Sequence, residues 1–219
     1  MPRNLKTTAW RLICISSLTV SLYPLYYLLA NQPVGLLMHK SGELLVSTTW
    51  NIAFYSHICL GGVALAVGWM QFVKSLRQLH PSAHGTVGIV YAVAVLISGL
   101  SGIYIAQSAN GGLISGLGFA TLGIAWLATT GAGCYYIIRG KVVQHRAMMT
   151  YSYALCLAAV TLRILLPLLI ILFGEFVTAY RVVAWLCWLP NLGIAYLIQD
   201  RSHPKESYPI IIYQTKNSI

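Results

Sequence analysis

Charge is scarce in this sequence, and negative charge is the scarcest. Only 8% of the 219 residues are charged, with four Asp or Glu against 14 Lys or Arg. Soluble domains carry about 25% charged residues, so this chain has too few charged side chains to cover a water-exposed surface. The composition therefore excludes a soluble globular protein.

The shortage of carboxylates also limits the chemistry. Glu43, Glu175, Asp200 and Glu206 all lie outside the centres of the apolar stretches. No carboxylate stands near a histidine to activate water, which argues against a hydrolase. No apolar stretch carries an Asp or Glu at its centre, which argues against a proton pump. The five cysteines are odd in number and include no CxxC pair, so neither a disulfide framework nor a cysteine metal site is indicated.

Apolar residues make up 58% of the chain and gather in six long stretches. Each stretch is long enough to cross a hydrocarbon core of about 30 Å as a helix. The sequence predicts an all-α fold: a single polytopic membrane domain over residues 1–219 with a short cytoplasmic tail at 199–219. The six expected transmembrane helices are 9–30, 49–73, 85–106, 114–138, 147–172 and 180–198. The first follows a basic start without an evident cleavage site, so a retained signal anchor is expected.

The net charge of +10 reflects membrane topology and does not indicate nucleic-acid binding. Basic residues flank alternate ends of the expected spans, and the opposite side holds only Lys40 and Arg181. The positive-inside rule then places both termini in the cytoplasm. The basic residues on that side are Arg3, Lys6, Arg11, Lys74, Arg77, Arg139, Lys141, Arg146, Arg201, Lys205 and Lys216.

Small residues favour close packing of the second to fifth spans, because helices in lipid associate through van der Waals contact. The first and sixth spans carry bulky aromatic residues suited to the membrane interface, so they are expected to be peripheral. No pair of spans shows the matched Gly or Pro interruptions typical of secondary transporters.

Arg163 is the most informative residue, because a cation inside a span is costly to bury and needs a partner. It shares a helical face with His145, Ser152 and Cys156, and His57 on the second span lies at a similar depth. We expect Arg163 to face the bundle interior and to line a polar cavity with His57. Leu155, Leu162, Leu166 and Leu169 are expected to face lipid. The alternative is an arginine that caps backbone carbonyls or extends to the interface.

Three histidines stand at the expected cytoplasmic ends of spans. Pro81 is typical of a first helical turn, which places His80 near an N-cap and His84 one turn later. His145 precedes the fifth span. Histidine is a common metal ligand and an axial ligand of haem, so His80, His84 and His145 are predicted to converge as a divalent metal site. Two of them could hold a haem, and the alternative is that all three contact headgroups and water.

The combination of these residues resembles an uncharacterised family of bacterial multi-pass membrane proteins over residues 50–170. The resemblance implies an inner-membrane location and supports the histidine and arginine positions, but it implies no reaction. Gly85, Ile89 and Thr150 stand where the family's basic residues are expected, so a cytoplasmic anion site would be weaker here. The residues that carry the resemblance are His57, Gly61, Gly62, Gln71, Phe72, Arg77, His80, Pro81, His84, Gly88, Tyr91, Gly111, Gly112, Gly118, Phe119, Trp126, Thr129, Thr130, His145, Arg146, Met149, Thr161, Arg163 and Pro167.

Three functions compete on this evidence. The first is a redox protein that binds haem b or a quinone, with His57, His84, His145 and Arg163 as the candidate cofactor-binding residues. The second is a transporter or binder of a small molecule with a central His57/Arg163 cavity. The third is an assembly or accessory protein whose polar residues only hold the bundle together. A metal-dependent lipid enzyme is a further alternative.

Overall fold

The computed structural model describes residues 3–202. Every regular element in this range is helical, as the composition predicts. In chain order these elements are α1 (Arg3–Ser21), α2 (Tyr23–Leu28), the 3-10 helix η1 (Gly35–His39), α3 (Gly42–Val46), α4 (Thr48–Gly68), the 3-10 helix η2 (Trp69–Phe72), α5 (Lys74–Leu79), α6 (Pro81–Ala106), α7 (Leu113–Ile138), α8 (Val142–Cys156), α9 (Ala158–Phe173), α10 (Phe176–Leu186) and α11 (Leu189–Ser202).

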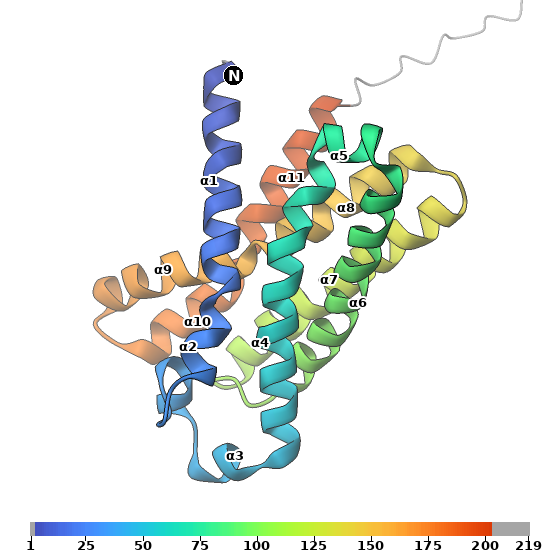
Figure 1. Ribbon diagram of the computed structural model, residues 1–219. Helices are drawn as coiled ribbons and strands as arrows, with labels where there is room; N and C mark the ends of the chain where they lie inside the picture. Colours follow the sequence, from blue (N-terminus) through green and yellow to red (C-terminus); the bar gives the residue numbers. More distant parts are fainter. Residues whose placement is uncertain (1–2, 203–219) are drawn as a thin grey trace, which may run out of the picture.

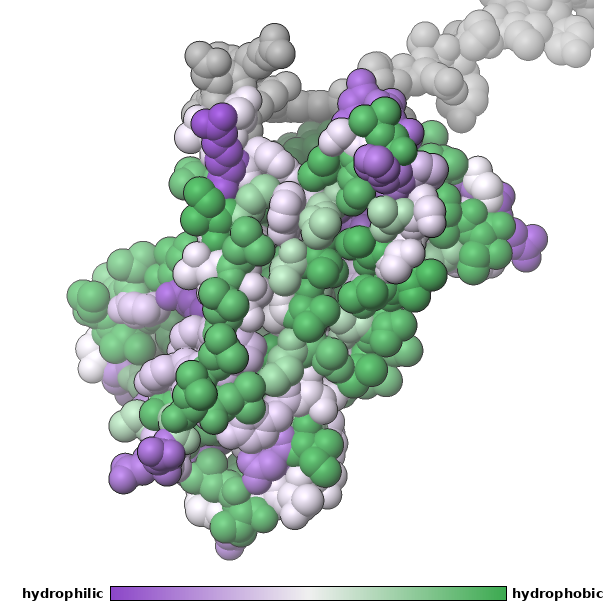
Figure 2. Space-filling view, viewed as in Figure 1, coloured by the Kyte–Doolittle hydropathy of each residue, from purple (hydrophilic) through white to green (hydrophobic). Residues whose placement is uncertain are grey.

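The six expected transmembrane helices are confirmed. Helical segments long and apolar enough to cross a membrane cover Thr7–Leu28, Thr48–Phe72, Pro81–Ala106, Leu113–Ile138, Val142–Phe173 and Phe176–Asp200. A helix satisfies its own backbone hydrogen bonds, which lipid requires. Figure 2 shows a mainly hydrophobic surface over these helices, with hydrophilic residues gathered towards the ends. The expected tail at 199–219 lies mostly outside the described residues.

The bundle has two ends, which we name after the short helices found there (Figure 1). The α5 end carries the start of α1, helix α5 and the α7–α8 turn. The α3 end carries η1, helix α3 and the α6–α7 turn. The topology expected from the basic residues would place the α5 end in the cytoplasm.

Helices α4, α6, α7 and α8 pack side by side in chain order and form the centre of the bundle. Helix α1 lies against α4, and α11 lies against α8. Helix α9 packs mainly on α10 and extends away from α6 and α7, to the left of Figure 1. The bundle is therefore close-packed on one side and more open where α9 and α10 separate from α4 and α6.

The fifth and sixth spans are both interrupted, contrary to the expectation that no paired interruption exists. The fifth span breaks at Leu157, between α8 and α9, and the sixth breaks between α10 and α11. Asn191 connects the two breaks, because its side-chain amide donates to the Ala154 carbonyl at 3.2 Å and to the Cys187 carbonyl at 3.1 Å. It also lies 3.1 Å from the Thr161 hydroxyl. No Gly or Pro marks the break at Leu157, so the sequence pattern did not reveal it. The break in the sixth span is followed by Pro190 in the first turn of α11, a signal that the sequence analysis did not use.

The first span is peripheral, as expected, because it buries the smallest share of its residues among the six spans. The sixth span is as buried as most of the others, which corrects the expectation drawn from its aromatic residues. Ser17 on α1 and Val183 on α10 are fully buried, and Cys187 after α10 is fully buried as well. Tyr27 on α2 is only 4% exposed. Aromatic residues near a helix end can face protein as readily as the membrane interface, because lipid provides no hydrophobic force that separates the two positions.

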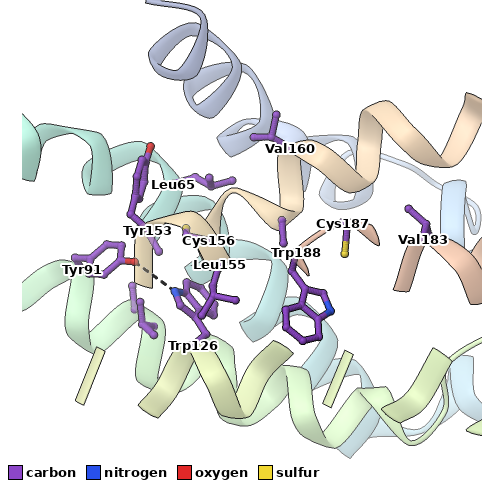
Figure 3. Close-up of a cluster of buried hydrophobic side chains, with 14 of the residues drawn as sticks. Leu65, Tyr91, Trp126, Tyr153, Leu155, Cys156, Val160, Val183, Cys187 and Trp188 are labelled. Carbon is purple, nitrogen blue, oxygen red and sulfur yellow. Dashed lines mark hydrogen bonds between the residues drawn. The ribbon is translucent and has the colours of Figure 1, made fainter. Parts of the chain in front are cut away.

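A cluster of buried hydrophobic side chains fills the centre of the bundle (Figure 3). We call the part of the bundle around the hydrogen-bonded groups of Tyr91, Ser152, Thr130 and Tyr153, on the α5 side of the cavity, the packed half. Tyr91 Oη accepts a 3.3 Å hydrogen bond from Trp126 Nε1 and shares one of 2.8 Å with Ser152 Oγ. Ser152 shares a further bond of 2.7 Å with Thr130 Oγ1. Tyr153 Oη lies 2.9 Å from Ser17 Oγ, which ties α1 to α8. The polar groups of this cluster are paired with one another.

Candidate functional site

A cavity of about 620 Å³ lies between α2, η1, α4, α6, α7 and the α9–α10 pair. This volume falls in the range typical of small-molecule sites, roughly 300–1,000 Å³. Along α4 the lining extends from Trp50 near the α3 end to Leu65 in the middle of the bundle. Fifteen residues of helix span about 22 Å, so the cavity is long. We call the part of the bundle around it the cavity half.

Arg163 lines this cavity from α9, as its helical phase predicted. One terminal guanidinium nitrogen donates a 2.8 Å hydrogen bond to the Ala159 carbonyl one turn earlier. The guanidinium carbon lies 4.1 Å from the ring centroid of Tyr23, in cation–π contact. Arg163 Nε is buried and has no hydrogen-bond partner. The guanidinium is therefore held in place while part of its donor capacity stays unused.

His57 lines the same cavity from α4. Its Nδ1 lies 2.9 Å from the Ser98 carbonyl oxygen, and a carbonyl can only accept, so Nδ1 carries the hydrogen. Ser98 Oγ in turn donates to the His57 carbonyl at 2.9 Å. A Cβ on Gly102 would lie 2.8 Å from His57 Nδ1, so a glycine is needed beside the ring. This arrangement fixes the ring and leaves Nε2 of the neutral form as an acceptor.

Lys40 adds a second cation at the α3 end of the cavity. Its Nζ donates to the Ser108 carbonyl and lies 5.9 Å from the centroid of the Trp50 ring. Lys40 lies outside the spans, and its partial burial lowers the pKa of its ammonium group. His39 lies nearby in the lining and stacks on Phe176 with 4.0 Å between ring centroids.

An aromatic cluster of Tyr27, Trp50 and Phe54, packed against Leu37, lies at the α3 end of the cavity. Trp50 and Phe54 stack with ring centroids 5.2 Å apart, and Phe54 contacts the edge of Tyr27. Gly35 starts η1 with φ +55°, and a Cβ there would lie 2.8 Å from Tyr27 Oη. A larger residue would therefore push η1 away from the aromatic cluster. Trp50 Nε1, like Arg163 Nε, is buried without a partner.

No Asp or Glu is found among the described residues that line the cavity. Glu175, the carboxylate nearest to Arg163 in sequence, accepts a hydrogen bond from Thr178 instead. Arg163 and Lys40 thus add positive charge to walls that are otherwise mainly aliphatic and aromatic. Such a cavity suits a ligand with an apolar body and an anionic group.

The leucines expected to face lipid do not form the lipid-facing side of the fifth span. Leu155 is only 2% exposed, and Leu162 and Leu166 line the cavity. Leu169 packs against the core cluster. The exposed side of α9 consists of Ile164, Leu168, Ile171 and Leu172. The size of the leucine side chains did not indicate which side of α9 faces lipid. One face of α9 lines the cavity and an adjacent face packs on α10, and both faces carry bulky apolar residues.

The three histidines at the α5 end do not form the predicted metal site. No group of three or more His, Cys, Asp or Glu side chains in the described part of the chain is placed to hold a metal ion. His145 Nδ1 donates to the Gly133 carbonyl at 2.8 Å, and His84 Nδ1 is buried without a partner. His80 caps α6 through its backbone, as Pro81 indicated. The three histidines therefore do not share one metal ion.

The haem site was predicted between two of the three histidines at the α5 end, and it stays a prediction. In the cavity, among the described residues, no second histidine from a transmembrane helix pairs with His57. His57 is the histidine that a transmembrane helix contributes to the lining, and His39 comes from η1 and stacks on Phe176. His84 and His145 lie outside the lining. The cavity therefore combines His57 with Arg163, which corresponds to the small-molecule hypothesis more closely than to a bis-histidine haem.

Sequence reasoning missed Tyr23, Tyr27 and Lys40 as cavity residues. The two tyrosines were assigned to the membrane interface, and Lys40 was used only for topology. Asn191 was missed as the residue that joins the two helix breaks. A polar amide within the sixth span was the available signal, because such side chains in lipid need a partner.

Comparison with known proteins identifies a family and no individual relative. Residues 54–199 match a family described as "Predicted membrane protein (DUF2306)". Neither the curated proteins nor the solved structures include a significant match to this chain.

Proposed function

For a chain that belongs to the DUF2306 family of predicted membrane proteins, we propose that it binds an amphipathic small molecule with an anionic group in the cavity beside Arg163. The observation that carries this proposal is the buried guanidinium with an unpartnered Nε in a cavity of about 620 Å³. A buried cation without a carboxylate partner is costly. An anionic ligand group would offset that cost with charge-assisted hydrogen bonds.

Each polar residue of the lining has a role in this proposal. Arg163 binds the anionic group, and its stacking on Tyr23 orients the guanidinium. His57 Nε2 can accept a hydrogen bond from a head group that keeps an O–H, such as a singly ionised phosphate. Lys40 attracts the anion at the α3 end of the cavity, and the aromatic cluster contacts the apolar body.

Equilibrium binding to the purified full-length protein in nanodiscs tests the proposal. The probes share one alkyl chain and differ in charge: laurate, dodecyl phosphate, dodecanol and dodecyltrimethylammonium. We expect the two anions to bind more tightly than the alcohol and the cation. Arg163→Leu should remove the preference for anions, and Arg163→Lys should restore part of it, since lysine keeps the charge without the planar fork. Equal binding of all four probes by the wild-type protein would refute the proposal.

The paired helix breaks favour transport as a second candidate function. Interrupted helices that line a site near the middle of the membrane are typical of secondary transporters. Here the fifth and sixth spans break together, and α9 and α10 both contribute to the cavity. Uptake of labelled laurate into proteoliposomes would distinguish transport from binding alone. Binding without uptake would leave the first proposal standing and reject this one.

We also propose that both termini face the cytoplasm of a bacterial inner membrane. The α5 end carries Lys74, Arg77, Arg139, Lys141 and Arg146, whereas the α3 end carries Lys40 and Arg181. This asymmetry agrees with the positive-inside rule. Reporter fusions at the two termini should both give a cytoplasmic signal, and a periplasmic signal at either terminus would contradict the topology.

A further inference from the structure

The polar and apolar groups of the cavity are separated along its length. Lys40, His39, Arg163 and His57 line the part nearer the α3 end and the middle. Beyond them, towards the α5 end, the lining consists mainly of apolar side chains and glycines: Leu65, Gly99, Leu122, Trp126, Leu155 and Leu162. On the unbroken helix α4, Leu65 lies eight residues beyond His57, so about 12 Å of helix separates the polar level from the inner limit.

Trp126 closes the inner limit, and a hydrogen bond holds its ring there. Its Nε1 donates to Tyr91 Oη at 3.3 Å. The side chain is only 7% exposed, and Figure 3 shows its bond to Tyr91. Tyr91 is held in turn by Ser152 in the packed half. The ring therefore has no free space into which it could move to lengthen the cavity.

We infer that the ligand is a single-chain amphiphile with a carboxylate or phosphate head at Arg163, whose apolar chain extends towards Trp126. Trp126 then sets the longest chain that the cavity accepts. This inference rests on the proposed function and adds the class and direction of the ligand. A single chain fits because the volume is that of one small ligand. The inward direction follows from the apolar lining between Arg163 and Trp126.

Position-specific fluorescence quenching tests the direction. The wild-type protein in nanodiscs is titrated with laurate brominated either at the terminal carbon or beside the carboxylate. We expect the terminally brominated acid to quench tryptophan fluorescence strongly and Trp126→Phe to remove most of that quenching. The affinity of this variant for unbrominated laurate is measured separately, so that quenching is compared at equal occupancy of the cavity. Trp10→Phe is the matched control, since Trp10 packs on Phe72 outside the lining and should not contribute.

The dependence of binding on chain length tests whether Trp126 sets the longest chain that the cavity accepts. Octanoate, decanoate, laurate and myristate, and the corresponding alkyl phosphates, are compared in wild type and Trp126→Ala. We expect the longest tightly bound chain to increase in the variant, with the phosphate series showing whether the head is a carboxylate or a phosphate. If Trp126→Ala does not fold, the quenching experiment on Trp126→Phe decides alone.

A failure of this inference and a failure of the proposed function would give different results. Arg163-dependent binding with terminal-bromine quenching unaffected by Trp126→Phe would overturn this inference and leave the proposed function intact. An unchanged length preference in folded Trp126→Ala would do the same. If neither the acids nor the alkyl phosphates bind to the wild-type protein, the proposed function fails together with the inference.

Discussion

The packed half and the cavity half share helix α4, yet the same face of this helix meets different surroundings in each. A Cβ on Gly68 would lie 2.6 Å from the Tyr153 ring and 2.9 Å from the Tyr91 ring. A Cβ on Gly61, seven residues earlier, would meet only Ser98 Oγ at 3.2 Å. The small-residue face therefore allows tight aromatic packing in one half and makes room for a cavity in the other.

The two halves also treat polar groups differently. In the packed half, the hydroxyls of Tyr91, Ser152 and Thr130 satisfy one another. In the cavity half, Arg163 Nε and Trp50 Nε1 are buried without partners. Buried polar groups in proteins are normally paired. Unpaired groups also occur towards the α5 end, at Trp69 Nε1 and His84 Nδ1. The cavity half differs because one of its unpaired groups belongs to a cation that lines the cavity.

The largest difference is expected from the same substitution in the two halves. Gly68→Ala should destabilise the protein by about 1–3 kcal/mol, because the new methyl overlaps two fixed aromatic rings. Gly61→Ala should change stability by less than about 1 kcal/mol, since alanine favours the helix and Ser98 can adjust. Thermal unfolding of the two purified variants measures both. Equal losses would show that the two halves are packed alike.

Substitution of Asn191 should have the next largest effect on stability, because its side chain connects the helix breaks of the fifth and sixth spans. Asn191→Leu removes its hydrogen bonds to the Ala154 and Cys187 carbonyls. At about 0.6 kcal/mol for an average side-chain hydrogen bond within a membrane protein, we expect a loss of roughly 1–2 kcal/mol. Thr161→Val removes only one of its contacts and serves as the milder comparison. If Asn191→Leu is as stable as wild type, the helix breaks do not depend on this residue.

The smallest effect concerns Lys40 and the pH dependence of binding. Burial lowers the pKa of its ammonium group from the ordinary value of 10.5. Lys40 is charged below that lowered pKa and neutral above it, so laurate binding should weaken as the pH rises through it. For a partly exposed cation we expect a loss of about two- to fivefold. Lys40→Met should remove this alkaline step, while its persistence in the variant would assign the step to another group.

Composition and charge were sufficient to predict the six spans, because the length of a membrane helix is set by the bilayer. The helical phase of Arg163 also predicted its place in the cavity correctly. The lipid side of α9 could not be predicted from Leu155 and Leu162, because apolar bulk serves lipid and protein contacts equally. Tyr27 on α2 and Lys40 at the end of η1 could not be predicted as site residues, because the position of η1 against α2 depends on tertiary packing that no local pattern encodes.

Thermal unfolding with and without dodecyl phosphate, in wild type, Tyr91→Phe and Arg163→Leu, tests the division between the halves most directly. A ligand at a hundred times its Kd stabilises the folded state by about 2.7 kcal/mol. Tyr91→Phe should lower the Tm of the free protein, since Ser152 and Trp126 lose a shared partner, and it should keep the ligand-induced increase. Arg163→Leu should leave the Tm of the free protein unchanged or higher and lose the increase. An increase that survives in Arg163→Leu, or that disappears in Tyr91→Phe, would contradict the assignment of binding to the cavity half.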